Sequence, residues 1–193
     1  MTKSGLNIIF ALIVAGLLIT AASFIYLNSG LEMRRSSPEA GSNQPSGNPD
    51  SNETIGKQLS ALEQMSSREP QNPGYPAQIA NIYYDAGDYQ KAIGYYQRSL
   101  DLRPKDPNIE TDLATCFHYL GQHDRALEIL NKVLEYSPGF PQALFNKGIV
   151  LVNGKNDVRA GIEVWEDLLR LNPDFPKRAE VEQRINQLKA SIR

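Results

Sequence analysis

The stretch GDYQKAIGYYQRSLDLRP, from Gly87 to Pro104, decides the fold because the chain repeats its pattern. The stretch GQHDRALEILNKVLEYSP runs from Gly121 to Pro138, with a glycine, an alanine, a leucine and a proline each 34 residues further on. A third copy, DVRAGIEVWEDLLRLNP, ends at Pro173, one residue late. A fixed period of this length is typical of stacked repeats, so it determines the architecture before single residues are interpreted.

Each copy has the pattern of two helices joined by a tight turn. In the first copy, Ile79, Ala80 and Tyr83 share one face of a helix, and Gly87 ends it because glycine adopts the left-handed conformation at little cost. Asp88 is then placed to cap the second helix. The sequence therefore predicts an all-α chain of helix pairs. The three predicted repeats span residues 73–106, 107–140 and 141–175.

Helical periodicity continues on both sides of the repeats. Ile55, Leu59, Leu62 and Met65 recur at helical spacing, which predicts an N-terminal helix over residues 55–69, equivalent to the second half of an earlier repeat. After the last repeat, apolar residues at helical spacing predict a capping helix over residues 176–193. Terminal repeats need such a helix because their outer face has no neighbour.

A long apolar run, LNIIFALIVAGLLITAASFIYL, occupies residues 6–27 without a charged residue. As a helix it would span roughly 33 Å, enough for the hydrocarbon layer of about 30 Å. A cleaved signal peptide is the alternative, with ITAAS as a weak cleavage site, but the run is longer than a signal core. We therefore predict a single-pass transmembrane helix at 6–27.

Residues 28–54 are predicted to be a flexible, disordered linker. The segment Ser36–Thr54 is rich in Ser, Pro, Gly and Asn and has no aromatic or branched aliphatic residue. Lys3 before the apolar run and Arg34 and Arg35 after it give no clear orientation. The solitary Cys116 cannot form an intramolecular disulfide, which suits an oxidising compartment. We expect the repeats to lie outside the cytoplasm, in the periplasm, tethered to the inner or plasma membrane.

No pattern in the sequence predicts an enzyme. The net charge is −2 with both signs mixed along the chain, which excludes the basic patch of a nucleic-acid-binding protein. His118 and His123 are the two histidines, and no nucleophile, metal-ligand spacing or phosphate loop accompanies them. Cys116 lies beside apolar positions and is expected to be a buried thiol. We expect no catalytic residues, no metal and no cofactor.

The three aligned copies resemble the tetratricopeptide repeat proteins over about Ile55–Arg193. The resemblance implies a right-handed superhelix with a concave groove lined by the first helix of each pair. It also implies a protein or peptide partner. Two departures stand out: the third turn, NGKNDVR, carries one extra residue, and Gly161 stands where the family has alanine. The third pair is therefore expected to sit at a different angle.

The groove residues that this resemblance implies occupy equivalent positions in the three repeats. They are polar and aromatic at one end and apolar at the other, which suits an extended or helical peptide with an apolar end. A merely solvated face is the alternative. A lysine clamp for a carboxylate tail is not expected, since Ala77 stands at its place. The groove residues are Ala77, Asn81, Tyr84 and Asp85, then Thr111, Thr115, His118 and Tyr119, and then Phe145, Ile149, Val152 and Asn153.

A closer resemblance is to bacterial cytochrome c biogenesis subunits. A membrane anchor, a loose linker, a lone helix and the ending IEVWEDLLRLNPDFPKRAEVEQRINQL, with Trp165, are similar to those proteins. That resemblance implies presentation of apocytochrome to the haem-attachment machinery. We predict a membrane-tethered interaction scaffold, with the biogenesis role as the alternative. The partner is expected to be membrane-associated or extracytoplasmic, and homo-oligomerisation stays open.

Overall fold

The computed structural model of the protein describes residues 49–192, and within them every regular element is a helix. The predicted transmembrane helix at 6–27 and most of the predicted linker lie outside these residues. Among the described helices, none combines the length and the apolar composition needed to cross a bilayer. The membrane anchor therefore stays a prediction.

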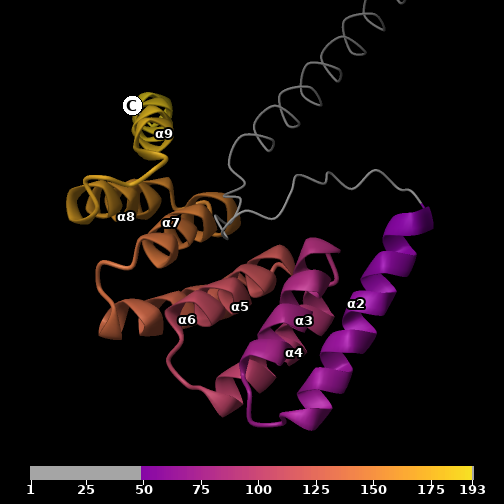
Figure 1. Ribbon diagram of the computed structural model, residues 1–193. Coiled ribbons are helices and arrows are strands. Elements are labelled where there is room, and N and C mark those ends of the chain that lie inside the picture. Colours follow the sequence, from indigo (N-terminus) through magenta and orange to yellow (C-terminus); the bar gives the residue numbers. More distant parts are fainter. Residues whose placement is uncertain (1–48, 193) are drawn as a thin grey trace, which may run out of the picture. The chain divides into compact units, whose positions relative to one another are not determined.

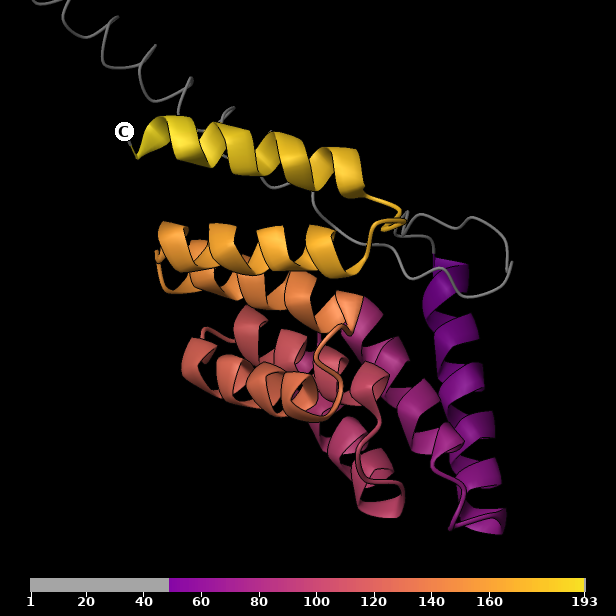
Figure 2. The same cartoon turned by 90° about the vertical axis from the view of Figure 1, so that its left-hand side faces the viewer.

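Three antiparallel helix pairs follow one another along the chain (Figure 1). They are α3 (Gly74–Asp85) with α4 (Tyr89–Leu102), α5 (Pro107–Tyr119) with α6 (His123–Tyr136), and α7 (Pro141–Ile149) with α8 (Val158–Leu171). On one side α2 (Pro49–Arg68) packs against α3, and on the other α9 (Arg178–Ser191) packs against α8 (Figure 2). The predicted all-α stack of helix pairs is confirmed.

The N-terminal helix begins earlier than the sequence predicted. It starts at Pro49 rather than at Ile55, so residues 49–54 are helical and do not belong to a flexible linker. Proline is favoured at the first helical position because its fixed φ suits the helix and its missing N–H is not needed there. Glu53 and Lys57, one turn apart, form an ion pair of 2.6 Å on this helix.

The first two turns are closed by the same hydrogen-bond pattern. Gly87 has φ 76° and Gly121 has φ 74°, the left-handed conformation predicted for both. In the first turn the N–H of Gly87 donates to the carbonyl of Tyr84, and that of Asp88 to the carbonyl of Tyr83, both at 2.9 Å. These two hydrogen bonds together form the Schellman motif, which satisfies the last carbonyls of a helix. The Asp88 carboxylate then accepts from the Lys91 N–H at 3.2 Å, the predicted cap.

The third turn differs because it must absorb an extra residue. The end of α7 continues as a π-helical turn, η1 (Val150–Gly154), in which the Lys155 N–H donates to the Val150 carbonyl at 3.0 Å. A π-helical bond spans one residue more than an α-helical bond. Asn156, with φ 55°, takes the left-handed position that glycine occupies in the other turns. The departure read from NGKNDVR thus has a structural basis.

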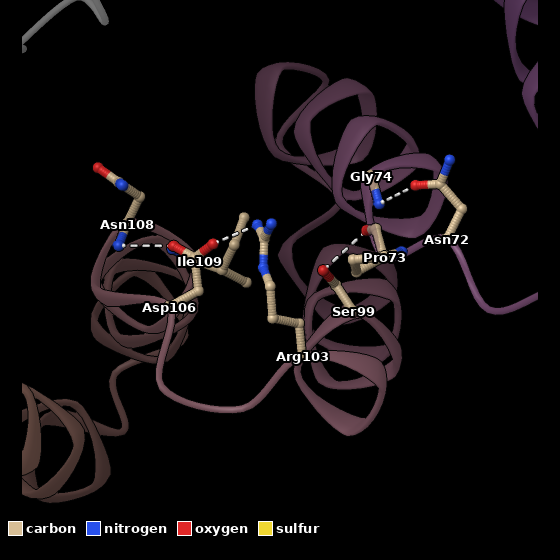
Figure 3. A network of polar contacts seen from close by, with 8 residues as sticks. All are labelled: Asn72, Pro73, Gly74, Ser99, Arg103, Asp106, Asn108 and Ile109. Atoms are coloured by element: carbon tan, nitrogen blue, oxygen red, sulfur yellow. Dashed lines mark hydrogen bonds and ion pairs between the residues drawn. The ribbon is translucent and has the colours of Figure 1, made fainter.

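The junction between the first and second pairs is fixed by polar contacts (Figure 3). The Asp106 carboxylate accepts from the N–H groups of Asn108 at 3.1 Å and Ile109 at 3.3 Å, which caps α5. Its other oxygen pairs with Arg103 at 2.5 Å. Ser99, buried on α4, donates to the Pro73 carbonyl at 2.9 Å and ties α4 to the start of α3. Asp106 therefore both starts a helix and orients it against the preceding one.

Small residues lie where the two helices of a pair approach most closely. In the first two pairs these are Ala80 with Ala92 and Ala114 with Ala126, all fully buried. In the third pair both equivalent positions are glycine. A Cβ at Gly148 would lie 2.1 Å from the Trp165 indole nitrogen, and one at Gly161 would lie 2.3 Å from a Val152 methyl group. The third pair therefore lacks two methyl groups, and the space is filled by the Trp165 indole at Gly148 and by Val152 at Gly161.

Candidate partner-binding face

The structure distributes the twelve predicted groove residues over three environments. Three are buried, six are half-buried and three are exposed. The buried ones are Thr111, Phe145 and Val152; the half-buried ones are Ala77, Asn81, Tyr84, Thr115, His118 and Ile149; the exposed ones are Asp85, Tyr119 and Asn153.

In each repeat the most exposed predicted position is the last one, next to the turn between the two helices. The exposed residues Asp85, Tyr119 and Asn153 are the last predicted position of each repeat and are 34 residues apart. The positions at the start of the helices are half-buried in the first repeat and buried in the other two. A partner could therefore reach the face made by α3, α5 and α7 mainly at the turn end.

Phe145 does not line an open groove, contrary to the sequence-based expectation. Its side chain is only 1% exposed, and its ring lies 6.3 Å from that of Trp165 and 5.9 Å from that of Phe175, measured between centroids. Gly148 admits the Trp165 ring to the space between α7 and α8, and Phe145 packs beside it. Phe145 is a core residue, so it contributes to stability rather than to partner contact.

Thr111 and Val152 are core residues as well. The Thr111 hydroxyl donates to the Pro107 carbonyl at 2.6 Å, within its own helix, which satisfies it without a partner. A Val152 methyl group fills the space that Gly161 leaves open. Most side chains of the predicted apolar end of the groove are thus buried by packing within the third pair.

Polar contacts hold the middle of this face. Asn81 accepts from the Tyr96 hydroxyl at 2.8 Å, and the Thr115 hydroxyl accepts from the Asn146 amide at 2.9 Å. Asn146 lies on α7, so the second bond links the first helices of the second and third repeats. Sequence reasoning missed Asn146, although a polar residue on a first helix was a signal for it. These bonds give the face a fixed geometry.

A row of five rings runs along the turn end of the face, and we call it the aromatic row: Tyr84, Tyr89, Tyr119, His118 and His123. The rings of Tyr89 and Tyr119 stack at 4.6 Å between centroids, and Tyr84 meets them edge-on or tilted at 5.6 Å and 6.2 Å. His118 lies 5.8 Å from Tyr119 and 4.9 Å from His123. Tyr119, 47% exposed, presents the most open ring of the row.

Two members of the row, Tyr84 and His118, have pKa values shifted in the direction that favours the neutral ring. Burial, followed by the neighbouring Tyr119, raises the pKa of the Tyr84 phenol, so it stays protonated. Burial, followed by the neighbouring His123, lowers the pKa of His118, so its imidazole stays uncharged at neutral pH. Sequence reasoning included three members and missed Tyr89 and His123, which follow the turns rather than precede them.

The described residues contain no arrangement suited to catalysis by a metal or thiolate. Within residues 49–192, no group of three or more His, Cys, Asp and Glu side chains could hold a metal ion. Cys116 is fully buried, and burial raises the pKa of its thiol to about 12. A thiol of that pKa is not a nucleophile at neutral pH.

A shallow cleft lies between α8 and α9, and none of the predicted groove residues lines it. Across it the Lys189 amine pairs with the Glu166 carboxylate at 2.5 Å. The third charged residue of the cleft, Glu182, pairs with Arg178 at 2.9 Å, so the aromatic row remains the better candidate for contact with a partner.

Models of the tetratricopeptide repeat match two overlapping stretches of the chain, residues 76–138 and 111–176. Together they cover the three helix pairs seen in the structure.

Curated relatives match part of the chain. The chain is 35% identical over 98 residues to the photosystem I assembly protein Ycf3 of Acaryochloris marina, covering 48% of this chain and 59% of that protein. It is 32% identical over 121 residues to the Ycf3 of Synechococcus sp. strain WH7803, covering 50% and 69%. A 29% identity over 127 residues relates it to the general transcriptional corepressor ssn6 of Schizosaccharomyces pombe, of which it spans only 11%.

Solved structures share the fold at low sequence identity. The crystal structure of MamA superposes with a TM-score of 0.60 at 15% identity, covering 73% of this chain and 82% of MamA. The first repeat domain of Spaghetti (RPAP3) bound to the HSP90 peptide SRMEEVD gives 0.54 at 21%, covering 62% and 94%. The Yersinia enterocolitica type III secretion translocator chaperone SycD gives 0.55 at 19%, covering 63% and 91%.

Proposed function

Because the chain belongs to the tetratricopeptide repeat family, we propose that it binds a segment of a partner protein along the first helices of its repeats. Proteins of this family mediate protein–protein interactions, and the relatives above include a peptide complex and a secretion chaperone. The observation that carries the proposal is the aromatic row, with the Tyr119 ring open to solvent at the accessible end of the face.

The row favours a partner segment with an apolar or aromatic side chain. Tyr119 is supported from behind by the stacked Tyr89 ring, so it would lose little conformational freedom on binding. Half-exposed tyrosines of this kind often dominate binding, at about 2 kcal/mol or more each. An acidic tail such as the HSP90 peptide is not the proposed ligand, because Ala77 and Thr111 supply no cation at the start of the face.

The finer part of the proposal is a membrane-tethered scaffold. The apolar run at 6–27 would hold the repeats at the membrane, outside the cytoplasm, and tethering would raise their effective concentration near membrane-associated partners. Relatives that are photosystem I assembly proteins support an assembly role within the interaction class. A cytochrome c biogenesis subunit is the second candidate, favoured by the resemblance of residues 161–188 and by the same assembly relatives.

Site-specific photo-crosslinking in native membranes tests the binding face. A photoreactive phenylalanine analogue at position 119 is expected to give a discrete crosslinked product. The matched control places it at Tyr136, which is also partly exposed but lies on the second helix α6. Equal products from both positions, or a product from position 136 alone, would exclude the first-helix face as the binding site.

The identified partner then allows affinities to be compared. Tyr119→Ala is expected to weaken binding by at least about tenfold, the equivalent of about 1.4 kcal/mol, while Tyr136→Ala leaves it unchanged. Both variants must keep the helical circular dichroism spectrum of the native chain. Haem-lyase components among the crosslinked proteins would favour the cytochrome c role, and other membrane complexes would favour the general scaffold.

A further inference from the structure

The two histidines of the chain meet across the turn between α5 and α6. His118 lies in the last turn of α5 and His123 is the first residue of α6. Their Nδ1 atoms are 3.1 Å apart, a hydrogen-bond distance, and both residues are half-buried. The Schellman turn at Gly121 fixes the two backbones between them, so the pairing is built into the hairpin.

This contact depends on how many protons the pair carries. With a neutral imidazole on at least one side, one Nδ1–H donates to the lone pair of the other Nδ1. When both rings are protonated, each nitrogen is a donor and none accepts. The hydrogen bond is then lost, and two positive charges face each other in a partly buried place. The geometry therefore tolerates one proton above the neutral pair and opposes the second.

The histidine pair contacts two neighbouring parts of the structure: the aromatic row and the turn of the third repeat. On one side His118 lies against the Tyr119 ring of the aromatic row. On the other side the His123 ring occupies the space next to Gly154, where an added Cβ would lie 2.6 Å from its Nδ1. Gly154 closes the π-helical turn of the third repeat. A movement of the pair would thus be transmitted to Tyr119 and to the junction with the third repeat.

We propose that the His118–His123 pair is a proton-sensitive latch, whose second protonation opens the α5–α6 turn and moves Tyr119 out of its stacked position. This inference rests on the proposed function, because Tyr119 is the open ring of the proposed binding face. Acidification below the range in which the pair holds a single proton then weakens partner binding.

The surrounding charges leave this response intact. Asp124, next to His123 on α6, pairs with Lys155 at 2.6 Å, so its carboxylate is already engaged by a cation from the third repeat. On α5 the buried Cys116 thiol is neutral, and on α4 Tyr89 contributes a phenol ring stacked on Tyr119. Arg125 lies over the Phe117 ring, 4.3 Å from its centroid. Burial and His123 lower the pKa of His118, in keeping with two rings that oppose joint protonation.

Nuclear magnetic resonance of the full chain tests the latch directly, because every histidine signal comes from this pair. Imidazole nitrogen spectra recorded from pH 8 to pH 4.5 are expected to show two proton uptakes more than about one pH unit apart, as for coupled sites. The ring protons of Tyr119 are expected to shift with the second uptake. Joint uptake in a single step near pH 6.5, or a Tyr119 ring that ignores the second step, would overturn the proposal.

His123→Gln is the matched variant, because glutamine can still hydrogen-bond to His118 but takes up no proton. The second step should vanish, and Tyr119 should keep its position throughout the range. In the crosslinking experiment, the yield from position 119 should fall at least threefold on acidification in the native chain and stay constant in H123Q. An equal fall in both chains would refute the latch. If position 119 gave no crosslinked product even at neutral pH, the proposed binding face would be refuted instead. The imidazole spectra test the latch separately, so the two failures can be told apart.

Discussion

The indole nitrogen of Trp165 donates a hydrogen bond of 3.0 Å to the backbone carbonyl of Phe145, and both side chains are 1% exposed. Trp165 lies on α8 and Phe145 on α7, so this bond joins the two helices of the third pair. The equivalent positions in the first two pairs are Tyr96 and Leu130, which are also fully buried. The third pair thus uses its largest side chain at the place where the others use smaller ones.

Trp165→Ala is expected to lower the free energy of unfolding by about 3–5 kcal/mol, because it removes a large buried ring and leaves a cavity. Trp165→Phe keeps most of the apolar volume but loses the hydrogen bond, so its loss should be smaller. Urea denaturation followed by circular dichroism measures both. A loss below about 1 kcal/mol for Trp165→Ala would contradict a core role.

Glycine-to-alanine changes should have opposite effects at different helical sites. Gly94→Ala, on the exposed side of α4 with open space around the new methyl group, should stabilise the protein by about 0.5–1 kcal/mol. Gly148→Ala should destabilise it by about 1–3 kcal/mol, because the methyl group would overlap the Trp165 ring. Thermal melting of the two variants is the measurement, and stabilisation by both would contradict the close packing of α7 on α8.

The helix pairs were predictable because their signals are local and repeated. The turns at Gly87 and Gly121 require the left-handed conformation, which glycine adopts readily. Asp88 and Asp106 cap helices through their own side chains. Three copies of the pattern reinforce one another. The start of α2 at Pro49 was missed, because the polar composition before Ile55 indicated a linker while Pro49 itself favoured a helix start.

The exposure of the candidate face was predictable only in part. Position in the repeat selected Tyr119, which is exposed, and also Phe145, which is buried. The difference arises from Gly148, whose missing side chain admits Trp165 and draws Phe145 into the core. The packing of Phe145 against Trp165 depends on residues 20 positions apart in sequence. The contact between His118 and His123 likewise depends on the geometry of a turn, which residue type alone does not show.

The predicted location of the repeats outside the cytoplasm can be tested independently of their fold. We expect a fusion of alkaline phosphatase after Arg193 to be active, because this enzyme folds only after export. A reporter that fluoresces only in the cytoplasm, fused at the same residue, should stay dark. The reverse result would place the repeats in the cytoplasm, as Arg34 and Arg35 by themselves would favour.

Cys116 should be unreactive in the folded protein. Burial raises the pKa of its thiol from 9.0 to about 12, which lowers the thiolate population about a thousandfold at neutral pH. Its side chain is also fully enclosed. A thiol reagent at pH 7.5 should therefore label the chain only after unfolding in urea. Rapid labelling under native conditions would show that the second repeat opens locally.

The last prediction concerns stability in mild acid. The lowered pKa of His118 means that the folded chain binds fewer protons at this site than the unfolded chain, whose histidines titrate near pH 6.5. This contribution to stability is complete above about pH 6.5 and is lost as the pH falls through the lower pKa of the folded state. One proton changes the free energy of unfolding by at most about 1.4 kcal/mol per pH unit.

Urea denaturation of the native chain should therefore show decreasing stability as the pH falls from 7 to 5. The paired carboxylates of Asp88 and Glu128, whose pKa values are lowered by Lys91 and Lys132, lose their contribution only below about pH 4, so they do not confuse this window. His118→Gln should flatten the dependence, because the residue that must take up a proton on unfolding is gone. An undiminished slope in that variant would show that the acid sensitivity originates elsewhere in the chain.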